Sequence, residues 1–155
     1  MLRDRIKSDL NESVKKRETT KVSVLRMLLS EVYDKEKKKR YQDKMEEDAT
    51  LSDGDLIDVI SSEIKKRKES ISVFEKTGSL DRADKEKEEL DILLSYMPEQ
   101  LAEDEISLII DQAIRDSKAT GLKDIGAVMA LVMPQVKGKA DGSEVGRLVK
   151  GALSR

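Results

Sequence analysis

Clusters of basic side chains are the feature of this sequence most able to act on a ligand. One cluster surrounds the segment Lys-Gly-Lys-Ala-Asp-Gly (137–142), and another is the run Lys-Lys-Arg-Lys (65–68). Such runs are more often solvated helix surface than binding sites, but lysine and arginine are also the usual contacts to phosphates. The candidate phosphate contacts are Lys137, Lys139, Arg147 and Lys150, with Lys65, Lys66 and Lys68 as a secondary set.

The segment 137–142 does not match a nucleotide-binding or calcium-binding loop. A Walker loop needs the pattern GxxxxGK[ST] between a strand and a helix, and no strand is predicted before this segment. A calcium loop needs several oxygen ligands at alternating positions, and only Asp141, Ser143 and Glu144 are present. Helix capping explains Asp141 and Glu144 without a metal. The first amides of the following helix could still accept one phosphate, although Asp141 would oppose it.

Catalytic chemistry has little support in the residue types. The chain has no cysteine and no histidine, so it lacks thiolate nucleophiles, the usual neutral-pH base and the commonest ligands of transition metals. A catalytic carboxylate would need burial or a like-charged neighbour to raise its pKa. Nearly every Asp and Glu instead stands among Lys and Arg on a predicted solvent face. We therefore expect no catalytic residue, no metal and no cofactor in this chain.

Composition favours a helical protein. Of its 155 residues, 40% are charged and 37% are hydrophobic, and the hydrophobic residues are mainly aliphatic. The aromatic residues are Tyr33, Tyr41, Phe74 and Tyr96. This is too few for a typical β-sandwich core, and we find no aromatic residues interleaved with the basic runs for base stacking. The sequence thus argues against recognition of single strands by stacking.

Charge is unevenly distributed along the chain. Residues 1–40 carry a net charge of +6, residues 41–116 carry −12 and residues 117–155 carry +4. The basic ends could meet a polyanion, whereas the acidic middle favours a basic partner. No signal peptide or apolar segment long enough to span a bilayer is visible, so the expected location is cytoplasmic.

Residues 1–97 show the spacing of four helices. Leu2, Ile6, Leu10 and Val14 mark an apolar stripe on the first, and the second opens near Thr19 or Thr20. Residues 41–51 lose the pattern. The third helix opens with a capping box of Ser52 and Asp55 and ends near Gly78, and the fourth runs from about Leu80 to Met97. The inward positions include Ile57, Ile60, Ile64, Ile71 and Phe74 in the third helix, and Ala83, Leu90, Leu94 and Met97 in the fourth.

Pro98 stops the fourth helix, and we place a domain boundary there. The apolar pattern of residues 98–155 predicts three helices. We expect the second of them to open at Asp124 and to end or kink at Pro134. The third is capped by Asp141. The apolar positions are Ile106, Ile109, Ile110, Ala113 and Ile114 in the first, Ile125, Val128, Met129 and Val132 in the second, and Val145, Leu148, Val149, Ala152 and Leu153 in the third. The predicted fold is all-α: a four-helix bundle at 1–97 and a three-helix bundle at 98–155.

Four motifs resemble the YqeY family, which shares a domain with the tail of the B subunit of the tRNA-dependent amidotransferase (GatB). They are VLRML (24–28), EIKKRKESI (63–71), LLSYMPEQL (93–101) and VMPQVKGKADG (132–142). The resemblance covers essentially the whole chain. It implies the same two helical bundles. The family usually has Ser or Thr where Ala102 stands, so the helix that follows should start less firmly here.

The charge distribution and the resemblance together leave three possible functions. In the amidotransferase this tail contacts tRNA while other domains carry out amidation, so the first is an accessory module that binds tRNA or another structured RNA. The second is a protein-interaction module that docks on a larger enzyme or on itself. The third is the carbon–nitrogen ligase activity, with glutamine as amido-N-donor, that labels members of the family. The chain has none of the glutaminase machinery that this third reading requires.

Overall fold

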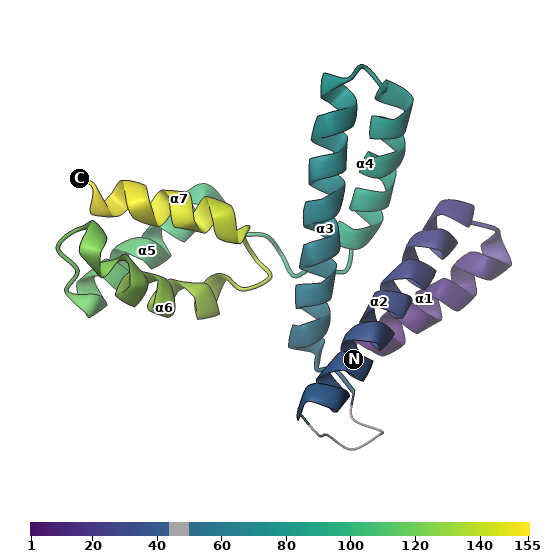
Figure 1. Ribbon diagram of the computed structural model, residues 1–155, viewed down its shortest axis with the longest axis horizontal. Helices are drawn as coiled ribbons and strands as arrows, with labels where there is room; N and C mark the ends of the chain where they lie inside the picture. Colours follow the sequence, from purple (N-terminus) through teal and green to yellow (C-terminus); the bar gives the residue numbers. More distant parts are fainter. Residues whose placement is uncertain (44–49) are drawn as a thin grey trace. The chain divides into compact units, whose positions relative to one another are not determined.

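The computed structural model describes residues 1–43 and 50–155, which form helices joined by short turns (Figure 1). The elements are α1 (Leu2–Lys16), α2 (Thr19–Asp43), α3 (Asp53–Lys76), α4 (Leu80–Leu94), α5 (Glu103–Ser117), the 3₁₀ turn η1 (Leu122–Asp124), α6 (Ile125–Val136) and α7 (Gly142–Leu153). No strand occurs in the described residues, which confirms the predicted all-α fold. The region 41–51, where the apolar pattern lapses, lies partly outside the described residues.

The chain divides into two compact units, Met1–Met97 and Pro98–Arg155. In the first unit, α1 and α2 form one helical hairpin, and α3 and α4 form a second (Figure 1). In the second unit, α5, α6 and α7 pack on one another. Each unit has its own cluster of buried apolar side chains and thus its own core.

Aliphatic side chains from all four helices fill the core of the first unit. Ile6 of α1, Leu25 of α2, Ile60 of α3 and Leu93 of α4 are each fully buried. The predicted stripe of α1 fails at its last position, because Val14 is 46% exposed. Its neighbour Ser13 is buried instead. These two residues lie in the last turn of α1, just before Arg17 takes a left-handed conformation (φ 57°) that ends the helix.

Both ends of α3 lie where the sequence signals place them. The Ser52 hydroxyl accepts the Asp55 amide at 3.2 Å, and the Asp55 carboxylate accepts the Ser52 amide at 3.1 Å, which confirms the capping box. The Ser52 hydroxyl also donates to the Asp55 carboxylate at 2.8 Å, and this bond, the Ser52 amide and the nearby Lys39 lower the pKa of Asp55. Gly78 has a φ of 74°, as its predicted role at a helix end requires.

The predicted end of α4 at Met97 is wrong by three residues. The helix ends at Leu94, and the Tyr96 and Met97 amides then donate to carbonyls only three residues back. This tighter turn is expected ahead of Pro98, which disfavours α geometry in the residue before it. Tyr96 is buried in the turn, where its hydroxyl donates to Asp9 at 2.6 Å; burial and that bond raise its pKa.

The second unit is built around three helices with clear apolar faces. Val128, Val132 and Val136 of α6 and Val145 and Val149 of α7 are fully buried. From α5, Ile106, Ile110 and Ala113 complete the core. These positions match the predicted pattern and its spacing of three and four residues.

The structure contradicts the expected side-chain cap of α6 and one of the two effects expected of Pro134, which were an end or a kink in the helix. Asp124 makes no side-chain cap bond to α6 and instead accepts the Thr120 amide at 2.8 Å and the Thr120 hydroxyl at 3.3 Å, bonds that lower its pKa. Pro134 does not end α6, which continues to Val136. Proline has no amide hydrogen, so Pro134 leaves one backbone carbonyl of α6 without its usual donor. Pro134 lies on the exposed side of the helix, where water can reach that carbonyl. The buried side chain of Val136 holds the last turn in place.

Candidate nucleic-acid interface

The loop between α6 and α7 carries Lys137 and Lys139 on a backbone fixed from two sides. Within the loop, the Lys139 amide donates to the carbonyl of Val136 at 2.8 Å, and Gly138 adopts a φ of 73°. From outside the loop, the Gln100 side-chain amide donates to the carbonyl of Gly138 at 2.8 Å. The Leu101 amide donates to the carbonyl of Lys139 at 2.8 Å. Both lysine side chains are exposed on this frame.

These bonds join two sequence motifs that are far apart in the chain. Gln100 and Leu101 close the stretch Tyr-Met-Pro-Glu-Gln-Leu (96–101), and the loop is the stretch Lys-Gly-Lys-Ala-Asp-Gly (137–142). The sequence singles out both stretches, but it gives no sign that they pair. The pairing explains why a glycine stands at 138, because a positive φ there lets the carbonyls of 138 and 139 face Gln100 and Leu101.

Asp141 occupies the amino terminus of α7. Its carboxylate accepts the amide of Ser143 at 2.8 Å and the amide of Glu144 at 3.2 Å, which confirms its predicted capping role. A phosphate bound at this helix terminus would have to displace that carboxylate. The amides at the start of α7 are therefore poor anion ligands, and the lysine side chains of the loop are the better candidates.

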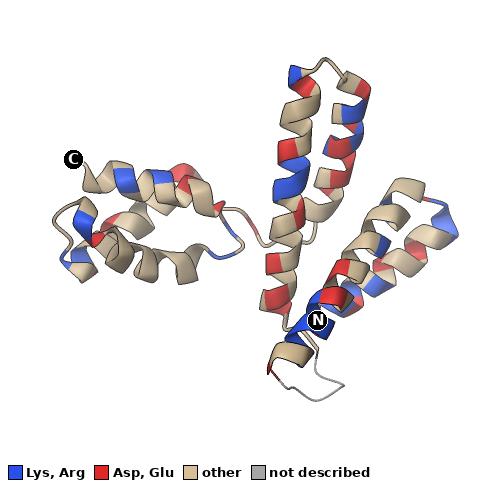
Figure 2. Ribbon diagram, in the orientation of Figure 1, with Lys and Arg blue, Asp and Glu red and all other residues tan. Residues whose placement is uncertain are grey.

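Arg147 and Lys150 lie on the outer face of α7. They are three residues apart and exposed, whereas Val145, Val149 and Leu153 face the core. Figure 2 shows basic positions along α7 and in the loop that precedes it. Arg147 lies 3.9 Å from Glu103, but both side chains are more than 60% exposed, so solvent screens this pair and it leaves Arg147 accessible.

The secondary set of lysines belongs to the first unit. Lys65, Lys66 and Lys68 are exposed on α3, and Lys66 is paired with Glu63 at 2.6 Å, a bond that raises its pKa. Arg67, between them, points inward and binds Glu63 at 2.9 Å and Glu89 at 3.3 Å. The seven candidate residues therefore fall into two sets: four in the second unit and three in the first.

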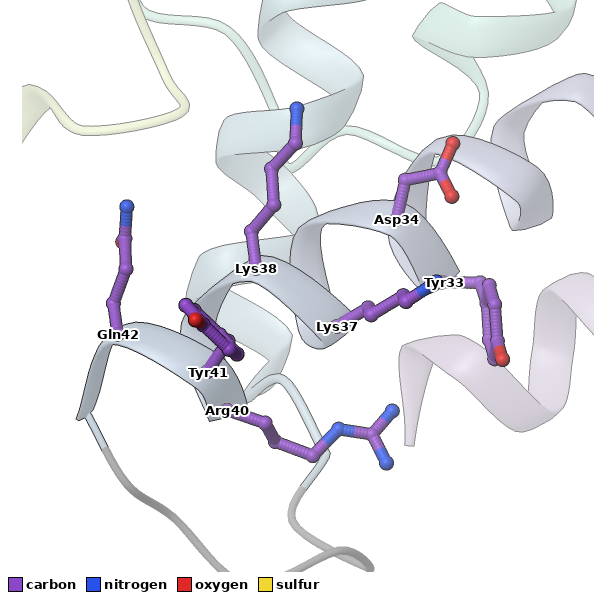
Figure 3. A pocket seen from close by; sticks show the side chains of 7 residues that line it. All are labelled: Tyr33, Asp34, Lys37, Lys38, Arg40, Tyr41 and Gln42. Atoms are coloured by element: carbon purple, nitrogen blue, oxygen red, sulfur yellow. The ribbon is translucent and has the colours of Figure 1, made fainter.

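A further basic surface lies at the end of α2, where sequence reasoning missed two aromatic residues. Tyr33 and Tyr41 are 60% and 90% exposed and flank the basic run 35–40. With Lys37, Lys38 and Arg40 they line a shallow open groove of about 890 Å³ (Figure 3). No aromatic residue lies within the basic runs, as the sequence shows, but Tyr33 and Tyr41 border the run on α2 and line the same groove.

The carboxylates include two exceptions to the predicted solvent exposure. Glu36 and Glu63 are 4% and 3% exposed, and each lies against an arginine. Glu36 links α2 to α1 through Arg3, whereas the partners of Glu63, Lys66 and Arg67, lie in its own helix α3. Among the described residues, no group of three side chains could hold a metal ion, and no helix is long and apolar enough to cross a membrane.

The fold and this surface define an all-helical protein of two compact units with a fixed basic loop in the second. A family model described as Yqey-like protein matches residues 3–153, and the chain belongs to that family. An uncharacterized protein of Schizosaccharomyces pombe is 34% identical over 61% of this chain and 70% of its own length. The "altered inheritance of mitochondria protein 41, mitochondrial" of Pyrenophora tritici-repentis is 26% identical over 90% of this chain and 74% of its own length.

Proposed function

We propose that this protein is a non-catalytic module that binds structured RNA, with tRNA as the best-fitting class, through contacts to phosphates. Lys137, Lys139, Arg147 and Lys150 make the main contacts, and Lys65, Lys66 and Lys68 are secondary. The observation that carries the proposal is the fixed loop. Because Gln100 and Leu101 hold its backbone, Lys137 and Lys139 are presented to a phosphate with little ordering cost.

Residues 117–155, the C-terminal part of the second unit, have a composition that fits recognition of a nucleic-acid backbone. They carry a net charge of +4, whereas residues 98–116 carry −5, and residues 98–155 contain no aromatic side chain. Without rings for stacking, this unit would read the shape and charge of a folded RNA rather than its bases. The resemblance to the tail of the tRNA-dependent amidotransferase supports the choice of tRNA.

The test is binding of the whole protein to bulk tRNA, titrated with salt, beside a duplex DNA of similar length. Four neutralised phosphates predict a slope of about −3 to −4 in a plot of log affinity against log salt concentration. The double variant Lys137→Glu, Lys139→Glu should weaken binding at least tenfold and make the slope shallower. Lys123→Glu is the matched control, because η1 precedes α6 and the loop follows it, about 18 Å away along the helix.

Two results would refute the proposal. The first is no binding to tRNA at low salt. The second is equal weakening per reversed charge by Lys123→Glu and by the loop variant, which would mean that only net charge matters and the loop has no special part.

A second candidate function, docking on a larger enzyme, is favoured by the outer face of α6. This helix has no charged residue in its twelve positions, and it exposes Leu131 (41%) and Met133 (36%) as well as Ala127 and Ala130. A nuclease-treated pull-down should then recover one stoichiometric protein. Leu131→Glu should abolish the recovery and leave binding to tRNA unchanged; recovery unchanged by this variant would exclude the α6 face.

A further inference from the structure

We propose that the outward face of the second half of α2 binds unpaired nucleotides of a single-stranded nucleic acid, with Tyr33 and Tyr41 stacking on bases and Lys37 between them contacting phosphate. We call these three residues the α2 stripe. The stripe lies in the first unit and uses none of the residues of the proposed RNA interface, so it stands on separate observations.

The spacing of the stripe places its three side chains on one face of the helix. Positions 33, 37 and 41 are four residues apart, so each lies almost directly above the previous one, and the two tyrosines are separated by about 12 Å along the axis. Figure 3 shows Lys37 extending along α2 toward Tyr33. The core contacts of α2 come from another face, through Leu25, Leu28, Val32 and Glu36.

The exposure of the two rings has no structural purpose within the described residues. A tyrosine usually buries its ring and gives its hydroxyl a hydrogen-bond partner, as Tyr96 does with Asp9 at 3% exposure. Tyr33 and Tyr41 expose most of their surface and stand on a helix whose inner face is already packed. An aromatic face of this kind is suited to a flat partner.

The charge around the stripe selects an anionic partner. Five of the six residues at 35–40 are Lys or Arg. The sixth, Glu36, is buried, bound to Arg3 and to the Leu51 amide, so it contributes little negative charge to the surface. Among the described residues that line the groove, Asp34 is the acidic one, beside Lys37, Lys38 and Arg40. The groove is therefore predominantly cationic, with a ring at either end of the stripe.

A single nucleic-acid strand can contact both the tyrosine rings and the basic side chains of this surface. Acidic peptides would pair with the lysines and leave the rings unused, and a duplex keeps its bases stacked inside. The two tyrosine positions are separated by about 12 Å along the helix axis, several times the 3.4 Å rise of one strand of a duplex, so the rings would hold bases of an unstacked strand. Stacking on two rings and phosphate contacts between them are the usual means of sequence-tolerant single-strand binding.

Intrinsic tyrosine fluorescence offers a direct test. The chain has no tryptophan, and Tyr96 is buried, so Tyr33 and Tyr41 are its two accessible fluorophores. Titration of the whole protein with oligouridylate at low salt should quench this emission. In parallel, the affinity should be measured by anisotropy of a dye-labelled oligouridylate, which does not need the tyrosines as reporters.

The variants separate stacking from charge. Tyr33→Ser with Tyr41→Ser should weaken binding at least fivefold for each ring removed, whereas Tyr33→Phe with Tyr41→Phe should keep the wild-type affinity. Val73→Ser with Leu80→Ser is the matched control, because it removes two other exposed apolar side chains of the same unit and should have no effect. Circular dichroism checks that each variant keeps its helical content.

Three results would overturn the proposal: no binding of the oligonucleotide, equal affinity of the serine and phenylalanine variants, or equal competition by polyglutamate. The last would identify the site as a general anion or acidic-protein surface. Lys137→Glu with Lys139→Glu should leave the quenching unchanged. Failure of the α2 stripe is thereby distinguishable from failure of the RNA interface in the second unit.

Discussion

Glu36 connects three separate segments of the first unit. Its carboxylate accepts the backbone amide of Leu51 at 2.8 Å, forms an ion pair with Arg3 and lies 4.0 Å from Arg40. It thus joins α2 to α1 and to the residues that lead into α3. A carboxylate buried in this way is tolerated only because charge and hydrogen bonds compensate it.

Replacing Glu36 with alanine should therefore destabilise the protein far more than replacing an exposed glutamate. Glu36→Ala leaves the Leu51 amide and the Arg3 guanidinium without their acceptor, which should lower the free energy of unfolding by about 3 kcal/mol. Urea unfolding measures this loss. The control is Glu12→Ala, since Glu12 pairs with Lys16 at 2.6 Å but both side chains are about 60% exposed. An equal loss in the two variants would show that Glu36 has no special role.

Arg67 shows why such contacts escape sequence reasoning. It lies between Ile64 and Ile71, beside the apolar stripe of α3, from which an arginine side chain usually extends toward solvent. In the structure it stays inside and binds Glu63 and Glu89. Glu63 is one turn away and could be anticipated, but Glu89 comes from α4. The pairing depends on how α3 and α4 align, and the spacing of charges within either helix does not contain that information.

At the scale of elements, the apolar spacing predicted the helices well and their ends less well. The interior of α7 follows the pattern, with Val145, Val149 and Leu153 buried. The errors fall where two local preferences compete. Asp124 could cap α6, but Thr120 offers both an amide and a hydroxyl nearby. The end of α5 carries no glycine signal, because Lys118 takes the left-handed conformation (φ 55°) that glycine usually adopts.

The candidate interface was predictable residue by residue but not as a structure. The lysines at 137 and 139 can be read from the sequence, whereas the bonds from Gln100 and Leu101 join residues about forty positions apart. The α2 stripe was missed for another reason. Tyr33 and Tyr41 stand just outside the basic run, and only the helical geometry shows that they share a face with Lys37.

The start of α5 offers a stabilising substitution. Ala102 has the extended conformation of a helix N-cap (φ −72°, ψ 158°), and its amide already donates to the Glu105 carboxylate at 2.8 Å. Half of a capping box is thus present, but alanine has no side-chain acceptor. Ala102→Ser should complete the box and raise the free energy of unfolding of the second unit by about 1 kcal/mol.

The reverse substitution is the control for this prediction. Ser52→Ala should remove the complete box at the start of α3 and destabilise the first unit by about the same amount. Thermal unfolding followed by circular dichroism measures both. An Ala102→Ser variant no more stable than the wild type would mean that the serine hydroxyl does not bond the Glu105 amide.

For the whole molecule, the distribution of side chains predicts two units that fold without each other's residues. The buried cluster of the first unit is drawn from residues 2–97, and that of the second from residues 101–153. The second unit, Pro98–Arg155, has 58 residues, a size at which a single core gives only marginal stability. We therefore expect the second unit to unfold at the lower temperature.

The aromatic residues allow the two units to be observed separately in the intact protein. Tyr33, Tyr41, Phe74 and Tyr96 all lie in the first unit, so tyrosine fluorescence reports that unit alone, while circular dichroism at 222 nm reports the helices of both. Heating should produce a change in circular dichroism before the tyrosine signal changes. Val149→Ala, which removes a fully buried side chain from the second unit, should lower the temperature of the first transition and leave the tyrosine transition in place. Coincident transitions that both shift with Val149→Ala would instead show that the chain unfolds as one cooperative body, contrary to the assignment of two domains at Pro98.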